Sequence, residues 1–340
     1  MTRTFAIGDP QGPFAKVLEV LDRHGLLAGD RLAGDVVLVS IGDHFDYDHR
    51  DPAGCAREGL ALLRWLASHD YDQVKLLIGN HDAARVMELA SISDADFAIA
   101  RTCDPATYAA RFPHLPPQHV LARDYAAFTV EQRELVQELV DDGTMRLALR
   151  AQLLDGRDCL LTHAGITRRE LALLDLDFDP PPDPEIMATI LQGKLAEATS
   201  AAVSAWDRGQ LAPLSLAPLH VPGGDGKEGG GLLYHRPSNP VTGSLFDPER
   251  PRRFDPRTLP RGLVQVAGHS GHAKCVHELG AWCTFAARAR AHGGIRSIAV
   301  HGDDVVYDLG TAGDFILIDS ELRRIPAAEV ELLPLAQLYL

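Results

Sequence analysis

The stretch VVLVSIGDHFD, residues 36–46, decides the fold of this chain. Residues 36–41 form a compact run of aliphatic side chains that is typical of a buried strand. A cluster of polar residues then follows at the point where such a strand would end. The same design occurs twice more in the first third of the chain: residues 4–7 precede GDPQG at 8–12, and residues 74–78 precede GNHD at 79–82.

Two amphipathic segments separate these three strands. In residues 14–27 and 53–68 the apolar side chains recur at helical spacing. Strands that alternate with helices predict a parallel sheet covered on both faces, which binds its ligands at the carboxyl ends of the strands. We therefore expect the three polar clusters to meet at one edge of the sheet.

The rest of the chain adds further elements to what we expect to be a single domain, residues 1–340. A helical insertion spans about 91–144 and contains a helix over 130–140. A hairpin of residues 145–154 and 158–162 ends in His163, and a long helix follows at 185–206. A loop rich in Pro and Gly spans about 209–262, and a strand over 262–267 ends in GHSGH at 268–272. The last predicted strands are 295–300, 305–309 and 315–318.

Eight polar residues at five strand ends could act together: Asp9, Gln11, Asp43, Asp46, Asn80, His81, His163 and His269. Carboxylates, amides and imidazoles form a mixed nitrogen and oxygen set, which suits two divalent ions such as Mn²⁺, Fe²⁺ or Zn²⁺. A bridging carboxylate would hold two ions about 3.5–4 Å apart, the spacing used for in-line phosphoryl displacement. Each aspartate considered alone is also a common helix cap, so the chemistry depends on the whole set.

The motif order GD-x-x-G, GD-x-x-D, GNHD, THAG and GH resembles the calcineurin-like metallophosphoesterase superfamily, in particular its phosphoprotein-phosphatase branch. The resemblance implies an α/β fold, a β-sandwich of mixed sheets flanked by helices (αββα), with the metals at the carboxyl ends of the strands. It implies that Asp9 binds the first metal, that Asp43 bridges, and that Asn80, His163 and His269 bind the second metal. By the same resemblance a metal-bridging hydroxide attacks phosphorus. The resemblance also implies that His81 protonates the leaving oxygen and that Asp46 orients His81.

Three departures from the family pattern change these expectations. Gln11 replaces the histidine of the first motif, and an amide oxygen favours Mn²⁺ or Mg²⁺ over Zn²⁺ at the first site, or leaves that site partly filled. Tyr47 replaces a phosphate-binding arginine, for which Arg50 is a candidate substitute. The last motif reads H-x-x-H, so a ligand role for His272 stays open.

Arg236 is the candidate for a second phosphate-binding arginine, because a guanidinium group matches the geometry of phosphate. The preferred hypothesis is therefore a dinuclear phosphatase that hydrolyses phosphomonoesters and uses Mn²⁺. One alternative is a nucleotide or dinucleoside-polyphosphate hydrolase, and another is a degenerate binding module without activity. The substrate could be a phosphorylated small molecule, a nucleotide or a phosphoprotein.

The composition excludes other classes of protein. The chain has 340 residues, 46% of them hydrophobic, and a formal net charge of −14, which disfavours binding to extended nucleic acid. No apolar run is long enough to span a membrane, and the first twelve residues contain no apolar stretch of the signal type. The five scattered cysteines contain no C-x-x-C pair. We therefore expect reduced thiols and a cytoplasmic location.

Overall fold

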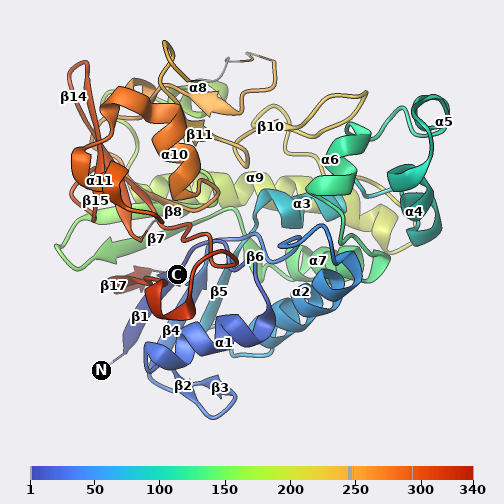
Figure 1. The fold of residues 1–340 in the computed structure, drawn as a ribbon, viewed down its shortest axis with the longest axis horizontal. Helices are drawn as coiled ribbons and strands as arrows, with labels where there is room; N and C mark the ends of the chain where they lie inside the picture. The colour runs from blue at the N-terminus through green and yellow to red at the C-terminus, as the bar shows by residue number, and fades with distance from the viewer. Residues whose placement is uncertain (1, 244–246, 248, 293, 340) are drawn as a thin grey trace.

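The computed structural model describes residues 2–243, 247, 249–292 and 294–339. A large mixed sheet lies at the centre, with helices on its outer sides (Figure 1). The main strands are β1 (Arg3–Ile7), β4 (Val36–Ser40), β5 (Val74–Leu77), β6 (Met145–Arg146), β7 (Ala148–Leu153), β8 (Asp158–Thr162), β13 (Val264–Ala267), β14 (Arg296–His301), β15 (Asp304–Leu309), β16 (Phe315–Leu317) and β17 (Leu333–Tyr339).

The helices are α1 (Phe14–Arg23), α2 (Pro52–Ala67), α3 (Asn80–Val86), α4 (Asp94–Thr102), α5 (Pro105–Arg111), α6 (Gln118–Arg123), α7 (Val130–Asp141), α8 (Arg168–Leu173), α9 (Pro184–Trp206), α10 (His272–Leu279) and α11 (Phe285–Ala289). Short 3-10 turns are η1 (Pro256–Thr258), η2 (Gly280–Trp282) and η3 (Ala327–Glu329). Two-residue strands are β2 (Leu27–Ala28), β3 (Arg31–Leu32), β9 (His220–Val221), β10 (Gly230–Gly231), β11 (Arg236–Pro237) and β12 (Arg253–Phe254).

The first arm of the sheet confirms the predicted parallel arrangement. β1, β4, β5 and β6 pair in parallel in that order. Helix α1 is shorter than the predicted 14–27 and ends at Arg23, because Gly25 adopts a φ of +67° that a helix does not allow. The polar clusters after β1, β4 and β5 consequently lie at one edge of the sheet.

The second arm contains the remaining motif strands. β7 and β8 form an antiparallel hairpin, and β8, β13 and β16 pair in parallel. The predicted strand at 145–154 is divided: Met145–Arg146 pairs with β5 in the first arm, and β7 begins at Ala148. The GH motif therefore follows a strand that lies beside the strand of the THAG motif.

Strand β17 connects the two arms, because it pairs antiparallel with both β1 and β7. Within the described residues the sandwich is thus one continuous eleven-stranded ladder, and not two separate sheets. One buried apolar cluster contains side chains of β1, β4 and β5 together with side chains of β7, β8, β13 and β16. The two arms face each other across this layer.

Helices cover the outer faces of both arms. A second apolar cluster unites α1, α2, α7 and α9 with the sheet, and α9 packs directly on β7 and β8. A further cluster joins α10 and α11 to β14, β15 and β16. This layering is the predicted αββα arrangement. Among the described helices, none is long and apolar enough to cross a membrane.

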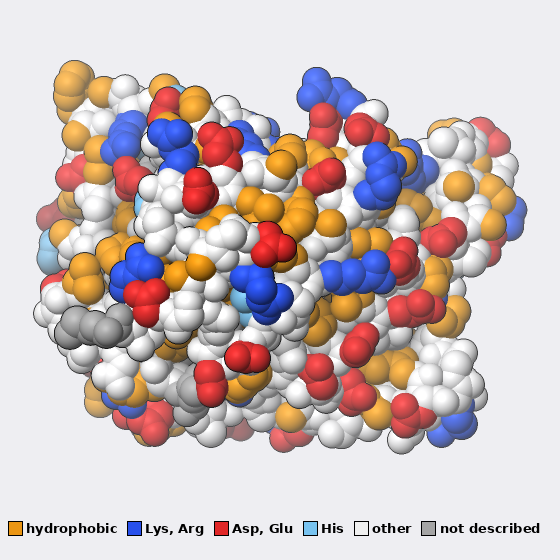
Figure 2. Space-filling view, turned by 90° about the horizontal axis from the view of Figure 1, so that it is seen from below, with side chains coloured by type: hydrophobic (Ala, Val, Ile, Leu, Met, Phe, Trp, Pro, Cys, Tyr) orange, Lys and Arg blue, Asp and Glu red, His pale blue; other side chains and the backbone are white. Residues whose placement is uncertain are grey.

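The two predicted additions lie beside the sandwich. Helices α4, α5 and α6 share a small apolar core of their own, and α4 and α5 form one end of the molecule in Figure 1. Within the predicted loop 209–262, the short strands β9 and β10 pair with each other, as do β11 and β12. Residues 244–246 and 248 of that loop lie outside the described residues. On the face in Figure 2, acidic and basic side chains are interspersed.

His220 makes the stability of this loop dependent on pH. Its ring is buried, is stacked on Tyr234 at 8°, and has no hydrogen-bond partner on either nitrogen in the described structure. Burial lowers the pKa of His220 from 6.5 to about 3. Between pH 6.5 and pH 3, therefore, the imidazole is protonated in the unfolded chain but not in the folded one. The neutral, buried ring of His220 therefore contributes its full stability above about pH 6.5. The free energy of unfolding falls as the pH is lowered from 6.5 toward 3, because protonation of His220 then favours the unfolded chain.

We expect the free energy of unfolding of the wild type to fall by about 3 kcal/mol more than that of His220→Phe between about pH 6.5 and pH 4. Phenylalanine preserves the stacking on Tyr234 and does not titrate. Urea titrations of both proteins across this range measure the difference. Parallel stability curves for the two proteins would contradict the assignment.

Candidate metal centre and active site

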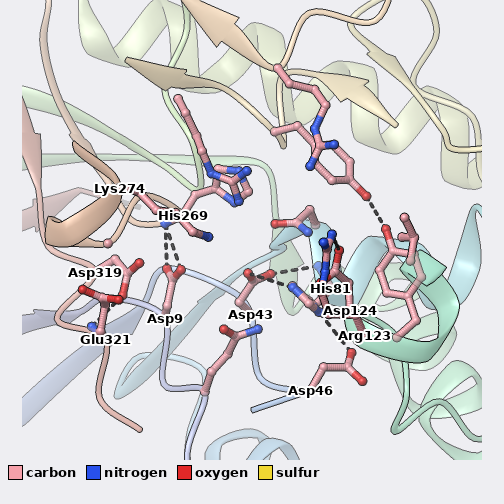
Figure 3. A pocket seen from close by; sticks show the side chains of 18 of the residues that line it. Asp9, Asp43, Asp46, His81, Arg123, Asp124, His269, Lys274, Asp319 and Glu321 are labelled. Carbon is pink, nitrogen blue, oxygen red and sulfur yellow. Dashed lines mark hydrogen bonds and ion pairs between the residues drawn. The ribbon is translucent and has the colours of Figure 1, made fainter. Parts of the chain in front are cut away.

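The ends of strands from both arms meet in one cavity of about 570 Å³ (Figure 3). The predicted site residues that line it are Asp9, Gln11, Asp43, Asp46, Asn80, His81, Arg236 and His269. His163 is buried beside them, with its Nε2 3.1 Å from Asn80 Oδ1 and 3.5 Å from Asp43 Oδ1. Arg50 is not brought to this group.

The backbone is strained at these positions. Of the described non-glycine residues, Asp9, Asp43, Asp46 and His269 have φ angles of 25°, 59°, 64° and 59°, values that side-chain-bearing residues seldom adopt. Such conformations cost about 1–3 kcal/mol each and concentrate at functional sites. The chain turns sharply off β1, β4 and β13 so that these side chains face the cavity.

Asp43, His163 and His269 form the centre of a candidate metal site. One ligand atom from each lies within 4.8 Å of the others. Nδ1 of His163 is 2.8 Å from the carbonyl oxygen of Ile41, and a proton on Nδ1 that is donated to this oxygen leaves Nε2 unprotonated. The lone pair of Nε2 would then face the oxygens of Asp43 and Asn80, an arrangement that a cation between them stabilises.

The residues at this site fit a divalent cation. Nε2 of His269 is buried without a hydrogen-bond partner among the described residues. Burial, helped by the nearby Arg236, lowers the pKa of His269 well below its usual range, so its ring is neutral and able to bind a metal. Burial, together with Asp319 and Asp43, raises the pKa of Asp9 well above its usual range, although the His269 N–H and the charge of Lys274 act in the opposite direction. A cation bound at Asp9 would stabilise its ionised form.

Two further observations concern the ligands around Asp9 and Asp43. Nε2 of Gln11 donates a hydrogen bond to the carbonyl of Phe45 at 2.9 Å, which leaves Oε1 of the amide as its only atom for a metal. A methyl group at Gly79 would overlap the Asp43 carboxylate, and one at Gly268 would overlap that of Asp9. These two glycines therefore have a steric role beside the ligands.

His81 lies next to the candidate metal site. Its Nδ1 lies 3.1 Å from Asp46 Oδ2, and its Nε2 lies 4.0 Å from Asp43 Oδ2. Burial would lower the pKa of His81, but Asp43 and Asp46 outweigh it and raise the pKa. The backbone N–H of His81 also donates to Asp43 at 2.8 Å, which fixes the imidazole relative to the candidate ligand.

Asp46 is held by three partners. Arg85 Nη1 lies 2.6 Å from Asp46 Oδ2, and the N–H of Ala127 donates to Oδ1 at 2.9 Å, in addition to the contact with His81. Burial would raise the pKa of Asp46, but Arg85 and His81 lower it, so the carboxylate stays ionised. Arg85 is fully buried, and sequence reasoning did not identify its role.

Asp82 links the GDHFD loop to the GNHD loop by hydrogen bonds. Its buried carboxylate accepts the backbone N–H groups of Asp43, His44 and Gly79 at 2.9–3.0 Å. The ring of His44 is enclosed between Ser40 and Asp82, so His44 supports the loop and does not enter the cavity. Asp82 stands in the quoted GNHD motif, but only the structure shows that it organises GDHFD as well.

The insertion and the long loop form the walls of the cavity. Arg123, Asp124 and Tyr125 line it from the insertion, and Tyr234 and Arg252 line it from the loop. The hydroxyls of Tyr125 and Tyr234 are hydrogen-bonded to each other, and the Tyr125 ring packs edge-on against His81. The two segments thus contact each other beside the candidate proton donor.

Two sequence candidates have other partners. Arg50 forms a two-point ion pair with Asp48, and its side chain is 80% exposed, so it does not replace the missing arginine. His272 contacts the Tyr307 hydroxyl and the Ala287 carbonyl through its two nitrogens, which leaves none for a metal. His235, which precedes Arg236 in the long loop, is buried against Glu170.

The chain matches one protein family and is similar to two solved phosphatases. A family model described as calcineurin-like phosphoesterase matches residues 2–193. The chain is similar to a protein serine/threonine phosphatase from Saccharomyces cerevisiae with similarity to human phosphatase PP5, with 14% identity over 94% of this chain and 67% of that chain and a TM-score of 0.42. It is also similar to the cold-active protein-tyrosine phosphatase of a psychrophile, Shewanella sp., with 16% identity over 95% and 72% of the two chains and a TM-score of 0.42.

No match was found among curated proteins. The family model nevertheless covers more than half of the chain, and its residues include the first four motifs. The chain therefore belongs to the calcineurin-like phosphoesterase family, whose members are metal-dependent hydrolases of phosphate esters.

Proposed function

We propose that this protein is a phosphatase that hydrolyses phosphomonoesters with two divalent metal ions, preferentially Mn²⁺. The observation that carries the proposal is the contact between two groups of residues in one cavity. The first is the cluster of Asp43, His163 and His269, and the second is the pair His81 and Asp46. Asp9 and Gln11 would complete the first metal site, and Asn80 would complete the second.

Each side chain then has a defined task. The bound ions would lower the pKa of the attacking water and offset the charge of the phosphate oxygens. Arg236, which lines the cavity, would bind the phosphoryl group. His81 would donate its proton to the leaving oxygen, and Asp46 would hold the imidazole in the orientation and charge state that this transfer requires.

The rest of the chain supports the same proposal. We infer a single domain in which the insertion at 91–144 and the loop at 209–262 form the substrate wall, because residues of both segments line the cavity. A cavity of about 570 Å³ is within the range of small-molecule sites, and a nucleotide or dinucleoside polyphosphate would be the alternative substrate class. All five cysteines are free thiols, which supports a cytoplasmic location.

The decisive experiment combines metal content with turnover. We expect two ions per chain by mass spectrometry after equilibration with Mn²⁺, and turnover of p-nitrophenyl phosphate that rises with added Mn²⁺. Gln11→His should shift the preference toward Zn²⁺, because imidazole is the softer ligand. A panel of phosphopeptides, nucleotides and dinucleoside polyphosphates then separates the substrate classes.

One bound ion with weak turnover, restored by Gln11→His, would identify Gln11 as the weak ligand of the first site. Protein that binds no metal and turns over no ester at any Mn²⁺ concentration would refute the proposal. That result would favour a binding module without activity.

A further inference from the structure

Two of the cations that line the cavity are without an ion-pair partner in the described structure. Its Arg and Lys residues are Arg123, Arg236, Arg252, Arg253, Lys274, Arg323 and Arg324. Most of these have partners: Arg123 pairs with Asp124, Arg252 with Glu228, Arg253 with Glu278, and Arg324 with Glu321, while Arg323 donates to the Tyr47 carbonyl. Arg236 and Lys274 are the exceptions in the described part of the chain, with neither an ion pair nor a side-chain hydrogen bond.

These two cations are close neighbours. Arg236 is on β11 and Lys274 is on α10, and these elements pack against each other. Arg236 is the strongest influence on the pKa of Lys274, which falls to about 8, and Arg253 and burial lower the pKa of Arg236 itself. The carboxylates of Asp319 and Asp124 attract both cations but form no ion pair with either in the described structure. An anion bound between the two cations would therefore still relieve their mutual repulsion.

Lys274 faces the same space as the candidate metal ligands. In Figure 3 it lies on the side of the cavity that carries His269 and Asp319, across from Arg123 and Asp124. Its charge acts on Asp9 and on His269, as their shifted pKa values show. Asp319 and Glu321 also act on Lys274 and raise its pKa, but neither forms an ion pair with it in the described structure, and Glu321 pairs with Arg324 at 2.9 Å.

Such a pair discriminates between kinds of phosphate ester. A phosphomonoester is close to a dianion at neutral pH and offers three non-bridging oxygens, whereas a diester is a monoanion with two. A guanidinium group binds two oxygens of the phosphate as a fork, and an ammonium group binds a further oxygen as a point charge. A diester leaves one of the two cations without a counter-charge.

We propose that Lys274, together with Arg236, forms an anion site that selects phosphomonoesters over phosphodiesters. Lys274 thereby takes the place that the sequence suggested for Arg50. The inference rests on the proposed function and adds a specificity-determining residue to it.

The test compares two esters in the same variant. With Mn²⁺ at saturation and pH 7, we expect Lys274→Gln to lower kcat/KM for p-nitrophenyl phosphate about 10- to 100-fold, the range for a lost hydrogen bond to a charged group. Turnover of bis(p-nitrophenyl) phosphate should change little, so the preference for the monoester falls. Lys274→Arg should retain the preference. Lys194→Gln is the matched control, because Lys194 pairs with Glu197 on the exposed side of α9.

Calorimetry with inorganic phosphate gives a second readout that does not require turnover. The dissociation constant of phosphate should rise in Lys274→Gln by a factor similar to the loss of kcat/KM for the monoester. An equal loss for both esters, or an unchanged phosphate affinity, would overturn the inference. If the wild type hydrolyses neither ester, the proposed function fails, and the phosphate titration still tests Lys274 independently.

Discussion

Replacement of Asp43 by asparagine is expected to remove tight binding of both metal ions, and turnover with it. The Asp43 carboxylate lies 3.5 Å from His163 Nε2 and 4.0 Å from His81 Nε2, so it contacts both a candidate metal ligand and the candidate proton donor. Asparagine has almost the same shape and can still accept the His81 N–H, but it lacks the charge and the second anionic oxygen. Loss of a residue that only hydrogen-bonds to a metal ligand lowers metal affinity by roughly 10- to 100-fold. We expect a larger loss for Asp43→Asn, because Asp43 is itself a proposed ligand.

Metal content by mass spectrometry and a Mn²⁺ titration of turnover measure this effect. Asp141→Asn is the matched control. It makes the same change in charge, and Asp141 is exposed at the end of α7. The circular dichroism spectrum of metal-free Asp43→Asn should match that of the wild type, since the substitution removes a buried charge without changing volume. A variant that still binds two ions tightly would refute the bridging role of Asp43.

The strand ends were predictable because their signal is local. Each is a short apolar run that ends in glycine and polar residues, and parallel pairing brings such ends together. The structure accordingly gathers Asp9, Asp43, Asn80, His163 and His269, which are up to 260 residues apart. Helix limits were also close, and the error in α1 came from the turn at Gly25.

The partners of these residues were not predictable, because each depends on contacts between distant segments. Asp82 was visible in its motif, but its hydrogen bonds to the backbone of Asp43 and His44 in another loop follow from how β4 and β5 pair. Arg85 on α3 forms a buried ion pair with Asp46, and no pattern in the sequence indicates that these two residues meet. Asp319 follows β16 as the other candidates follow their strands, yet one acid after a strand is too common a pattern to single out.

Arg50 shows the opposite error. Proximity in the sequence suggested that it could replace the arginine missing at Tyr47, but a neighbouring carboxylate two residues away binds its guanidinium first. Lys274, which lies more than 200 residues further along the chain, is without such a partner in the described structure. Candidates for a binding role are therefore better ranked by which charges remain unpaired than by distance along the chain.

Replacement of His81 by asparagine is expected to lower kcat about 10²- to 10⁴-fold while both metal ions stay bound. His81 is not among the proposed ligands, and its backbone N–H, which holds Asp43, is unaffected by the substitution. The loss should depend on the leaving group. An alkyl phosphate such as glycerol phosphate needs a proton on its departing oxygen, so it should lose the most, whereas p-nitrophenyl phosphate leaves as a stable anion and should lose the least.

Asp46→Asn tests the same role by a different route. Asp46 raises the pKa of His81, so its neutral replacement should lower that pKa and move the alkaline limb of the kcat profile to lower pH, because activity requires protonated His81. His301→Asn, at an exposed histidine at the end of β14, controls for the substitution itself. Equal losses for alkyl and aryl phosphates in His81→Asn, with metal content unchanged, would show that His81 binds substrate and does not protonate the leaving oxygen. An unshifted alkaline limb in Asp46→Asn would separate Asp46 from the proton transfer.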